Sequence, residues 1–350
     1  MGWLHPYIDT RRRDIDLGLY PRHHLWGCDA VESNKNWNAF QVKSTKFYIP
    51  KILEKIINRQ FFRESPGIHV ELSMWKTSKH YDVIYSVCGP LSLARFYKRA
   101  KLVSWVYRMP TLSKNQFSPY NVKNLKSHIG FCCLTPKANF KFSKHASSEF
   151  LPWCVDLKLF DGIPEEKTQT KPFFLASGKT GRDYVTLVKA AYTLKADIRI
   201  IGPHDERPSV LPKNIRWIDT STDPPDKAVN YNTLRKLYAQ CIAVCIPLAG
   251  DADDTCGYTN MLEAMAMAKP VLMTRSGSLH INPEQRGFGK LVNPKDSRDW
   301  ESSMIKILNN RQHYIKKGKE GRKIAEKEFS IENFNIRLIT FLESLIKTHI

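Results

Sequence analysis

Short apolar runs alternate along the chain with longer segments in which apolar residues recur at helical spacing. In the second half, the apolar runs predict strands at 172–177, 197–202, 214–218, 242–247 and 271–273. The segments between and after them predict helices at 185–194, 231–239, 259–268, 298–308 and 322–346. Alternating strands and helices are typical of a parallel, doubly wound sheet, so we expect an α/β fold.

The first half shows the same alternation less regularly. Apolar runs predict strands at 2–5, 81–86, 101–107 and 129–134, and helical spacing predicts helices at 28–32, 49–63 and 91–99. The stretch 9–18 is polar and basic, which predicts a loop between the first strand and the first helix. At 350 residues the chain is long for one domain and sufficient for two.

Composition is that of a globular protein, with 42% hydrophobic and 25% charged residues. The 8 cysteines form no CxxC pair and no Cys/His spacing suited to zinc, so reduced, buried thiols are expected. The chain has no signal peptide and no apolar run near 18 residues. A cytoplasmic protein is therefore expected.

The net charge of +20 predicts an anionic partner, which could be a nucleotide, a nucleic acid or an acidic membrane surface. No helix-turn-helix, zinc finger or aromatic RNA-binding motif is present, so we expect no nucleic acid. Segment 49–63 combines an apolar stripe with a basic face, and a second basic cluster follows it. The cations are Lys51, Lys55, Arg59 and Arg63, then Arg95, Lys98, Arg99 and Lys101. Peripheral association with the inner face of the membrane is one interpretation; a core-packed helix with a solvated charged face is the commoner one.

Segment 249–272 carries the strongest candidate chemistry. A polar loop that contains Gly257 follows the strand at 242–247, and the helix after it begins at about Thr259. The first N–H groups of a helix have no partner within it and favour an anion; here they belong to Gly257, Tyr258, Thr259 and Asn260. Further along the helix, the Glu263 carboxylate could accept hydrogen bonds from hydroxyls of a ribose or a sugar. Phosphate and sugar together indicate a nucleotide-sugar; the alternative is an ordinary helix packed on a sheet.

A second loop follows the strand at 172–177. Gly178 permits close approach of a ligand to the backbone, and Lys179 and Arg182 place two cations at the start of a helix. The spacing differs from that of a Walker A loop. Gly202 ends the next strand and is a further donor-binding candidate. The alternative is that both cations simply face solvent.

The stretch from Glu263 to Val271, EAMAMAKPV, resembles the retaining glycosyltransferases of family 4, which have the GT-B fold. Ala268 stands where that family usually has Gly, and Thr255 stands where it has a first Glu that touches the transferred sugar. The identity of the sugar therefore stays open. In this resemblance Lys179 and Arg182 take the place of the family's diphosphate-binding cations and are the catalytic candidates.

Segment 150–160, FLPWCVDLKLF, looks like the segment between the two domains of that family, with Cys154 in place of a Gly. The resemblance thus implies two Rossmann-like doubly wound domains that face each other across a cleft. We expect an acceptor-side domain at 1–155, a linker at 156–171 and a nucleotide-sugar-binding domain at 172–350. The last helix is expected to pack back toward the first domain.

The acceptor-side candidates come from the first half. His23, His24 and Trp26 lie in the loop expected to face the cleft, where they could stack on a sugar or bind it by hydrogen bonds. Tyr107 stands at the end of the strand 101–107, where the family often has a His near the transferred sugar. The alternative is that these side chains only pack the loop.

The function expected is that of a hexosyltransferase. It would move a sugar from a nucleoside-diphosphate sugar to a glycan or lipid-linked acceptor with retention of configuration, in the synthesis of surface polysaccharide or glycolipid. No cofactor or metal is expected, since cations and helix N–H groups neutralise the diphosphate. Asp251 and Asp253 could instead hold Mg²⁺, as in the other glycosyltransferase fold. A nucleotide-sugar epimerase of GT-B fold and a non-catalytic nucleotide-binding or other anion-binding protein are the alternatives.

Overall fold

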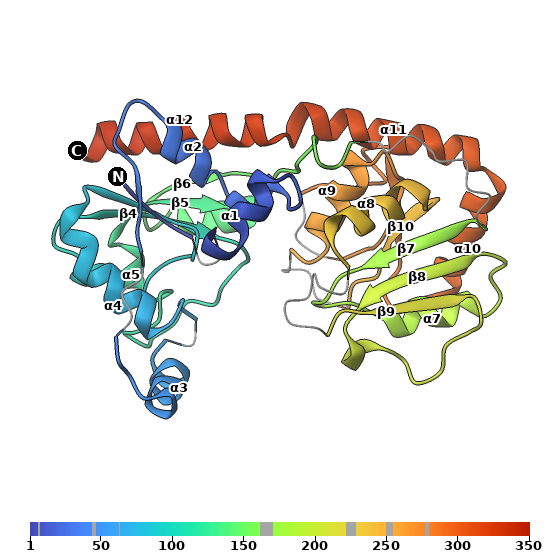
Figure 1. Cartoon of the computed structure of the whole chain (residues 1–350), viewed down its shortest axis with the longest axis horizontal. Coiled ribbons are helices and arrows are strands. Elements are labelled where there is room, and N and C mark those ends of the chain that lie inside the picture. The colour runs from blue at the N-terminus through green and yellow to red at the C-terminus, as the bar shows by residue number, and fades with distance from the viewer. Residues whose placement is uncertain are drawn as a thin grey trace. The chain divides into compact units, whose positions relative to one another are not determined.

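A computed structural model describes residues 1–5, 8–43, 47–62, 64–161, 171–221, 229–249, 255–276 and 280–350. The chain divides into two compact units, shown in Figure 1. The first unit comprises Met1–Arg12, His23–Trp153 and Glu332–Ile350, and the second comprises Arg13–Arg22 and Cys154–Ile331. Each unit contains one sheet in which all paired strands are parallel.

The sheet of the first unit has the strand order β2-β1-β3-β4-β5-β6. Its strands are β1 (Gly2–Leu4), β2 (Phe40–Gln41), β3 (Val83–Ser86), β4 (Lys101–Val106), β5 (His128–Cys133) and β6 (Ser147–Phe150). The residues of β3 and β5 are all buried, as expected for parallel strands covered on both faces. The strand that follows β1 in the chain, β2, pairs with one edge of β1, and the later strands β3 to β6 extend the sheet from its other edge.

The first unit also contains helices. They are α2 (Cys28–Ser33), α3 (Lys51–Gln60), α4 (Ile68–Thr77), α5 (Val122–Leu125), α6 (Pro136–Phe142) and α12 (Ile331–His349). Short 3₁₀ turns occur at η1 (Arg22–Leu25), η2 (Ser78–His80) and η3 (Ala94–Phe96). At α6, the Thr135 hydroxyl accepts the Ala138 N–H at 3.2 Å and Pro136 occupies the first turn, which explains where that helix begins.

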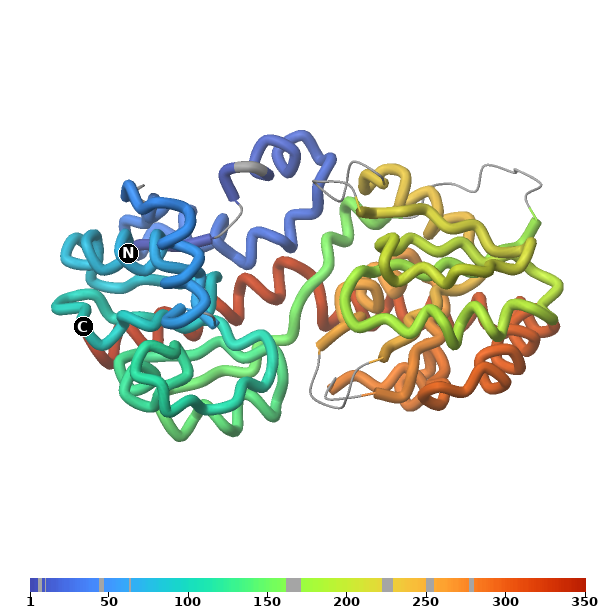
Figure 2. Tube along the Cα trace, turned by 90° about the horizontal axis from the view of Figure 1, so that it is seen from below, coloured from blue at the N-terminus to red at the C-terminus, as the bar shows by residue number. Residues whose placement is uncertain are grey.

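The sheet of the second unit has the order β12-β11-β10-β7-β8-β9. Figure 1 labels β10, β7, β8 and β9, and Figure 2 shows the same unit, coloured from green to red, from below. Its strands are β7 (Phe173–Ser177), β8 (Asp197–Gly202), β9 (Ile215–Asp219), β10 (Ala243–Ile246), β11 (Val271–Thr274) and β12 (Gly289–Val292). Its helices are α7 (Tyr184–Ala191), α8 (Tyr231–Gln240), α9 (Tyr258–Ala266), α10 (Ser297–Asn309) and α11 (Arg311–Glu328), with a 3₁₀ turn at η4 (His204–Glu206). The order reverses between β7 and β10, and at such switch points α/β sheets bind ligands beyond the carboxyl ends of the strands.

The predicted strands are confirmed, whereas three predictions about helices are wrong. The stretch 9–18 is not a loop, because α1 (Ile8–Asp16) forms there with Ile8 and Ile15 buried on one face. Segment 322–346 is not one helix: Val155 N–H donates to the carbonyl of Phe329 at 2.8 Å, and the chain is extended enough at Ser330 to pair with Val155.

The helix predicted at 91–99 is absent, and only the short turn η3 forms there. The buried Glu71 carboxylate accepts the N–H of Ser92 at 2.7 Å and that of Leu93 at 3.0 Å. A buried carboxylate needs such partners, and these two bonds hold the peptides of the segment in a turn. Helical spacing in the sequence could not show this competing interaction.

All eight cysteines are free thiols, as expected: Cys88 and Cys256 are half-buried and the other six are buried. Within the described residues, no helix is long and apolar enough to cross a membrane. The segment 162–170, which includes most of the predicted linker, lies outside the described residues.

Candidate functional site

Two loops meet at the carboxyl ends of β7 and β10 in the second unit. Arg182, in the loop after β7, pairs with Leu248, in the loop after β10. On either side of this bridge, Asp183 N–H donates to the carbonyl of Pro247 at 3.0 Å, and Ala249 N–H donates to that of Gly181 at 2.9 Å. The two loops in which the site is predicted therefore meet at the switch point of this sheet.

Helix α9 presents its N-terminus at the same edge. Its N-cap, Gly257, has φ 82° and supplies no side chain to the cap. A Cβ at this position would lie 2.6 Å from Cγ2 of Ile246, so a glycine is required both by the backbone and by the space. The amides of Thr259 and Asn260 belong to the first turn, where the helix itself offers no acceptor and an anion is favoured.

The Arg182 guanidinium is held by three acceptors. Its Nη1 donates to the carbonyl of Thr180 at 2.7 Å, its Nε to that of Ser177 at 3.4 Å, and its Nη2 to Oδ1 of Asn260 at 2.6 Å. A Cβ on Gly178 would lie 2.3 Å from Nη2, so the guanidinium occupies the space that a side chain would need there. The structure thus brings together Gly178, Arg182 and Asn260 from the predicted set.

The polar contacts continue from Asn260 into the interior. Its Nδ2 donates to Oγ of Ser177 at 2.9 Å and lies 3.5 Å from Oη of Tyr238. The Tyr238 hydroxyl donates to Oε2 of Glu263 at 2.8 Å. Arg182, Asn260, Tyr238 and Glu263 therefore form one continuous chain of hydrogen bonds.

Glu263 is 2% exposed and lies in the second turn of α9. Burial raises the pKa of its carboxyl from 4.5 to about 8, although the hydrogen bond from Tyr238 acts in the opposite direction. Burial likewise raises the pKa of the Tyr238 hydroxyl well above its usual value. At neutral pH the Glu263 side chain is therefore mostly protonated. Its role toward a ribose stays a prediction.

The other donor-side candidates line the same strand ends. The Lys179 side chain is exposed, while Gly202 is buried at the end of β8. Tyr258 is 1% exposed, its hydroxyl lies 3.4 Å from Nε2 of His280, and its N–H donates to the carbonyl of Thr255 at 3.2 Å. Neither its side chain nor its N–H is therefore open to a ligand, which leaves the N–H groups of Thr259 and Asn260. Asp251 and Asp253 lie outside the described residues. Among those that are described, no group of three or more His, Cys, Asp or Glu side chains could hold a metal ion.

In the first unit, all four acceptor-side candidates contact one cluster of aromatic rings. Trp26 stacks on Trp153 with ring centroids 4.2 Å apart, and it packs edge-on against Trp105 and Tyr107, each at 4.9 Å. The Tyr107 hydroxyl donates to the carbonyl of Val87, directly after β3. Trp26 is 8% exposed and Tyr107 is half-buried, so both mainly support this edge of the sheet.

His23 and His24 stand side by side, with ring centroids 4.5 Å apart. Burial lowers the pKa of His23 to about 3. The pKa of His24 is also lowered well below its usual value, by burial and by the neighbouring His23, His5 and Arg11. Both rings are neutral at physiological pH, and His24 is the less buried of the two. Acceptor binding by these residues stays a prediction.

Three residues that contact the candidate donor site from the interior carry no signal in the sequence. Tyr238 comes from α8, Ser177 ends β7, and the Tyr184 hydroxyl on α7 donates to the carbonyl of Gly178 at 2.8 Å. No spacing links these side chains to the two loops, because they lie on separate elements. Their position becomes clear only once the order of the strands is known.

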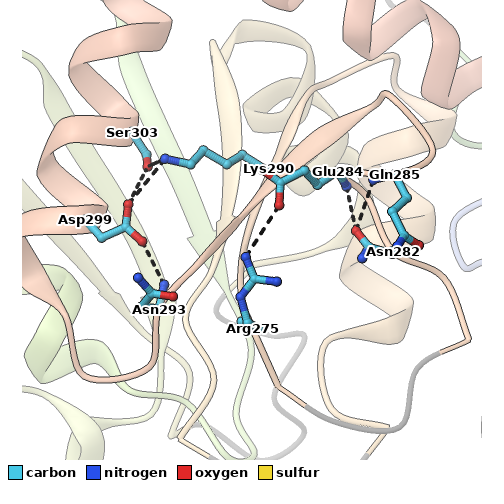
Figure 3. A network of polar contacts seen from close by, with 8 residues as sticks. All are labelled: Arg275, Asn282, Glu284, Gln285, Lys290, Asn293, Asp299 and Ser303. Atoms are coloured by element: carbon cyan, nitrogen blue, oxygen red, sulfur yellow. Dashed lines mark hydrogen bonds and ion pairs between the residues drawn. The ribbon is translucent and has the colours of Figure 1, made fainter.

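Beyond β11, a set of ion pairs stabilises the neighbouring loops (Figure 3). The Lys290 ammonium lies 3.3 Å from Oδ1 of Asp299 and donates to Oγ of Ser303 at 2.8 Å. Arg275, directly after β11, lies 3.5 Å from the Glu284 carboxylate. Since each of these charges has an opposite charge beside it, we assign this network to structure and not to ligand binding.

Comparisons with known proteins agree with this arrangement. Residues 182–310 match the family model of glycosyl transferases group 1. No curated protein sequence matches the chain significantly. HepE from Anabaena, solved in complex with UDP, is 13% identical over 98% of this chain and 99% of that one, with a TM-score of 0.65.

Two further solved structures are similar. Sucrose-phosphate synthase from Thermosynechococcus elongatus is 15% identical over 89% of this chain and 84% of that one, with a TM-score of 0.64. WaaG, a glycosyltransferase involved in lipopolysaccharide biosynthesis, is 13% identical over 87% of this chain and 91% of that one, with a TM-score of 0.55.

Two Rossmann-like units that match these structures define a protein of the GT-B fold. The second unit carries a glycosyl transferases group 1 domain, and this match marks the chain as a glycosyltransferase. The GT-B fold implied by the resemblance of 263–271 is thereby confirmed, and the match of 182–310 is consistent with the family that this stretch resembles.

Proposed function

We propose that this glycosyltransferase moves a sugar from a nucleoside-diphosphate sugar to a hydroxyl of a glycan or a lipid-linked acceptor, with retention of configuration. One observation carries the donor side of the proposal: the Arg182 guanidinium is held beside Asn260, in the first turn of α9, at the switch point of the sheet. A cation and the N-terminus of a helix at one place favour a diphosphate.

Cleavage of the anomeric C–O bond leaves negative charge on the diphosphate and gives the sugar oxocarbenium character. Arg182, Lys179 and the N–H groups of the first turn of α9 would stabilise that charge as it develops. In retention, the departing phosphate accepts the proton of the attacking hydroxyl on the same face of the sugar, and no separate protein base is needed. Because these groups are fixed and positive, we propose that no metal is required.

The similar structures support the choice of a first donor and of an acceptor class. HepE is solved with UDP and with UDP-glucose, so UDP-sugars are the first donors to test. WaaG takes part in lipopolysaccharide biosynthesis, which favours a surface glycan or a glycolipid as the product here. On the acceptor side, His24 is the candidate best placed to meet a sugar hydroxyl, since it is neutral and only half-buried.

We also propose that the first unit binds an anionic membrane surface through α3. This helix has no buried residue, and Ile52, Leu53 and Ile56 are 78%, 48% and 52% exposed. In Figure 1 it stands away from the sheet of its own unit. Exposed apolar side chains next to Lys51, Lys55 and Arg59 suit the boundary between anionic headgroups and acyl chains. Such binding would bring the enzyme to a lipid-linked acceptor at the inner face of the membrane.

The test is turnover of a panel of nucleotide-sugars by the purified full chain, measured as free nucleoside diphosphate with and without candidate acceptors. We expect release that depends on both a donor and an acceptor. Conversion of the donor to an isomer without any acceptor would establish an epimerase instead. Binding of nucleotides with no turnover across donors and acceptors would establish a non-catalytic protein.

A further inference from the structure

The side chain of Asn260 has no role in a site built only from cations and helix N–H groups, yet it makes three polar contacts. Two of the three acceptors around the Arg182 guanidinium are near it in sequence: the carbonyl of Ser177, which ends β7, and that of Thr180, in the loop after β7. The third, Oδ1 of Asn260, comes from α9 and makes the shortest of these contacts, 2.6 Å. An arginine side chain has several rotatable bonds, so an anchor from a second element restricts it strongly.

We propose that Asn260 is a positioning residue: its side chain holds Arg182 in the orientation that binds the diphosphate, and it joins Arg182 through Tyr238 to Glu263. This inference deepens the proposed function and rests on it. The guanidinium has donors only, so the amide must turn its oxygen toward Arg182 and its Nδ2 toward Ser177 and Tyr238. Nδ2 of Asn260 faces a lone pair of the Tyr238 oxygen. The Tyr238 hydroxyl can therefore direct its proton to Glu263, and its oxygen lies 2.8 Å from Oε2 of that residue.

All hydrogen bonds in this chain therefore run in one direction, from the cation to the buried carboxyl. Serial hydrogen bonds of one direction polarise each other, so a change at either end affects the other. The phosphate cation and the carboxyl proposed for the ribose thus form one unit. Loss of Asn260 would release the Nη2 end of Arg182 and require a bound diphosphate to order it again.

The experiment is a double-mutant cycle on the full chain. The unchanged protein, Asn260→Ala, Arg182→Ala and the double variant are titrated with UDP and with uridine by calorimetry. We expect Asn260→Ala to weaken UDP about tenfold, as loss of one charge-assisted contact would, and uridine less than about twofold. In the Arg182→Ala background, Asn260→Ala should change UDP affinity less than about twofold, because its effect passes through Arg182.

Two further variants separate positioning from folding. Asn260→Asp has the same shape, and its carboxylate would compete with the diphosphate for Arg182, so it should weaken UDP at least as much as Asn260→Ala does. Asn230→Ala makes the same chemical change away from the site, where Asn230 caps α8 through the N–H of Thr233 at 2.9 Å. That control should lower the melting temperature and leave UDP affinity unchanged.

The outcomes are distinct. Equal losses of UDP affinity from Asn260→Ala in both backgrounds, or an equal loss for uridine, would overturn the positioning role and leave the proposed function intact. An unchanged protein that binds none of UDP, GDP and ADP would overturn the proposed function, and the inference with it.

Discussion

Replacement of Glu263 by Gln tests whether a buried, protonated carboxyl lies at the centre of the donor-binding unit. The folded state raises the pKa of this group from 4.5 to about 8, with burial as the main cause. The folded chain therefore keeps a proton that the unfolded chain loses above pH 4.5. Unfolding releases this proton, so the contribution of Glu263 to stability falls as the pH rises from about 4.5 to about 8.

The size of this effect follows from the shift. One pKa unit corresponds to about 1.4 kcal/mol, so the full shift amounts to at most about 5 kcal/mol above pH 8, and to about 3 kcal/mol between pH 4.5 and pH 7. Glu263→Gln cannot ionise, and it keeps an oxygen that can accept the Tyr238 hydroxyl. The variant should therefore gain stability relative to the unchanged protein by a few kcal/mol as the pH rises over this range.

The assay is thermal or urea unfolding of the unchanged protein and of Glu263→Gln at several pH values between 4.5 and 8. The unfolding transition of the second unit is the quantity compared. In parallel, the donor KM of the unchanged protein should fall as the pH rises through about 8, because an ionised carboxylate accepts ribose hydroxyls better than the acid does. The Gln variant should raise KM more than it lowers kcat and should lack this pH dependence. Parallel stability curves across the range would show that Glu263 titrates near its ordinary pKa and would refute the reasoning.

Four further predictions concern the site and the surface. The double variant Lys179→Ala, Arg182→Ala should lose several kcal/mol of transition-state stabilisation, on the scale of ~1.5–3 kcal/mol for each charged contact. Lys189→Ala, on the exposed face of α7, is the control and should keep normal turnover. Near-normal turnover of the double variant would show that the diphosphate site lies elsewhere. Gly257→Val should abolish donor binding and destabilise the second unit, since its Cβ would lie 2.6 Å from Ile246; normal donor affinity would contradict the strained turn. Activity should survive EDTA, and a full loss restored by Mg²⁺ or Mn²⁺ would make Asp251 and Asp253 metal ligands. In sedimentation with vesicles, the protein should bind vesicles that contain anionic lipid and release them as the salt concentration rises toward about 0.5 M. The variant Ile52→Ser, Ile56→Ser should bind these vesicles more weakly. Equal binding to neutral vesicles, or no binding at low salt, would contradict the proposed membrane association.

Local patterns were sufficient to predict the described strands except β2, β6 and β12, and to select the two loops of the candidate donor site. Buried parallel strands such as β5 and β10 are continuous apolar runs, and Gly178 and Gly257 mark positions where a loop needs a glycine. These signals lie within a few residues of the feature they specify. For the same reason, Arg182 and Asn260 could be selected from the sequence, although not the contact between them.

What the sequence did not predict depends on contacts between distant elements. The turn at Ser92 and Leu93 forms because Glu71, some twenty residues earlier, captures their N–H groups. The burial of Glu263 and its bond to Tyr238 depend on how α8 packs beside α9. Similarly, α3 has an amphipathic pattern that fits a core helix, and only the structure shows that none of its residues is buried.

The central claim is that the second unit binds a nucleoside diphosphate through its phosphates, and calorimetric titration of the unchanged protein tests it most directly. UDP, GDP and ADP are titrated first, and the tightest of them is then compared with its monophosphate and its nucleoside at two salt concentrations. The account predicts that affinity falls from diphosphate to monophosphate to nucleoside, and that the diphosphate is the most sensitive to salt. A nucleoside that binds as tightly as its diphosphate would contradict it.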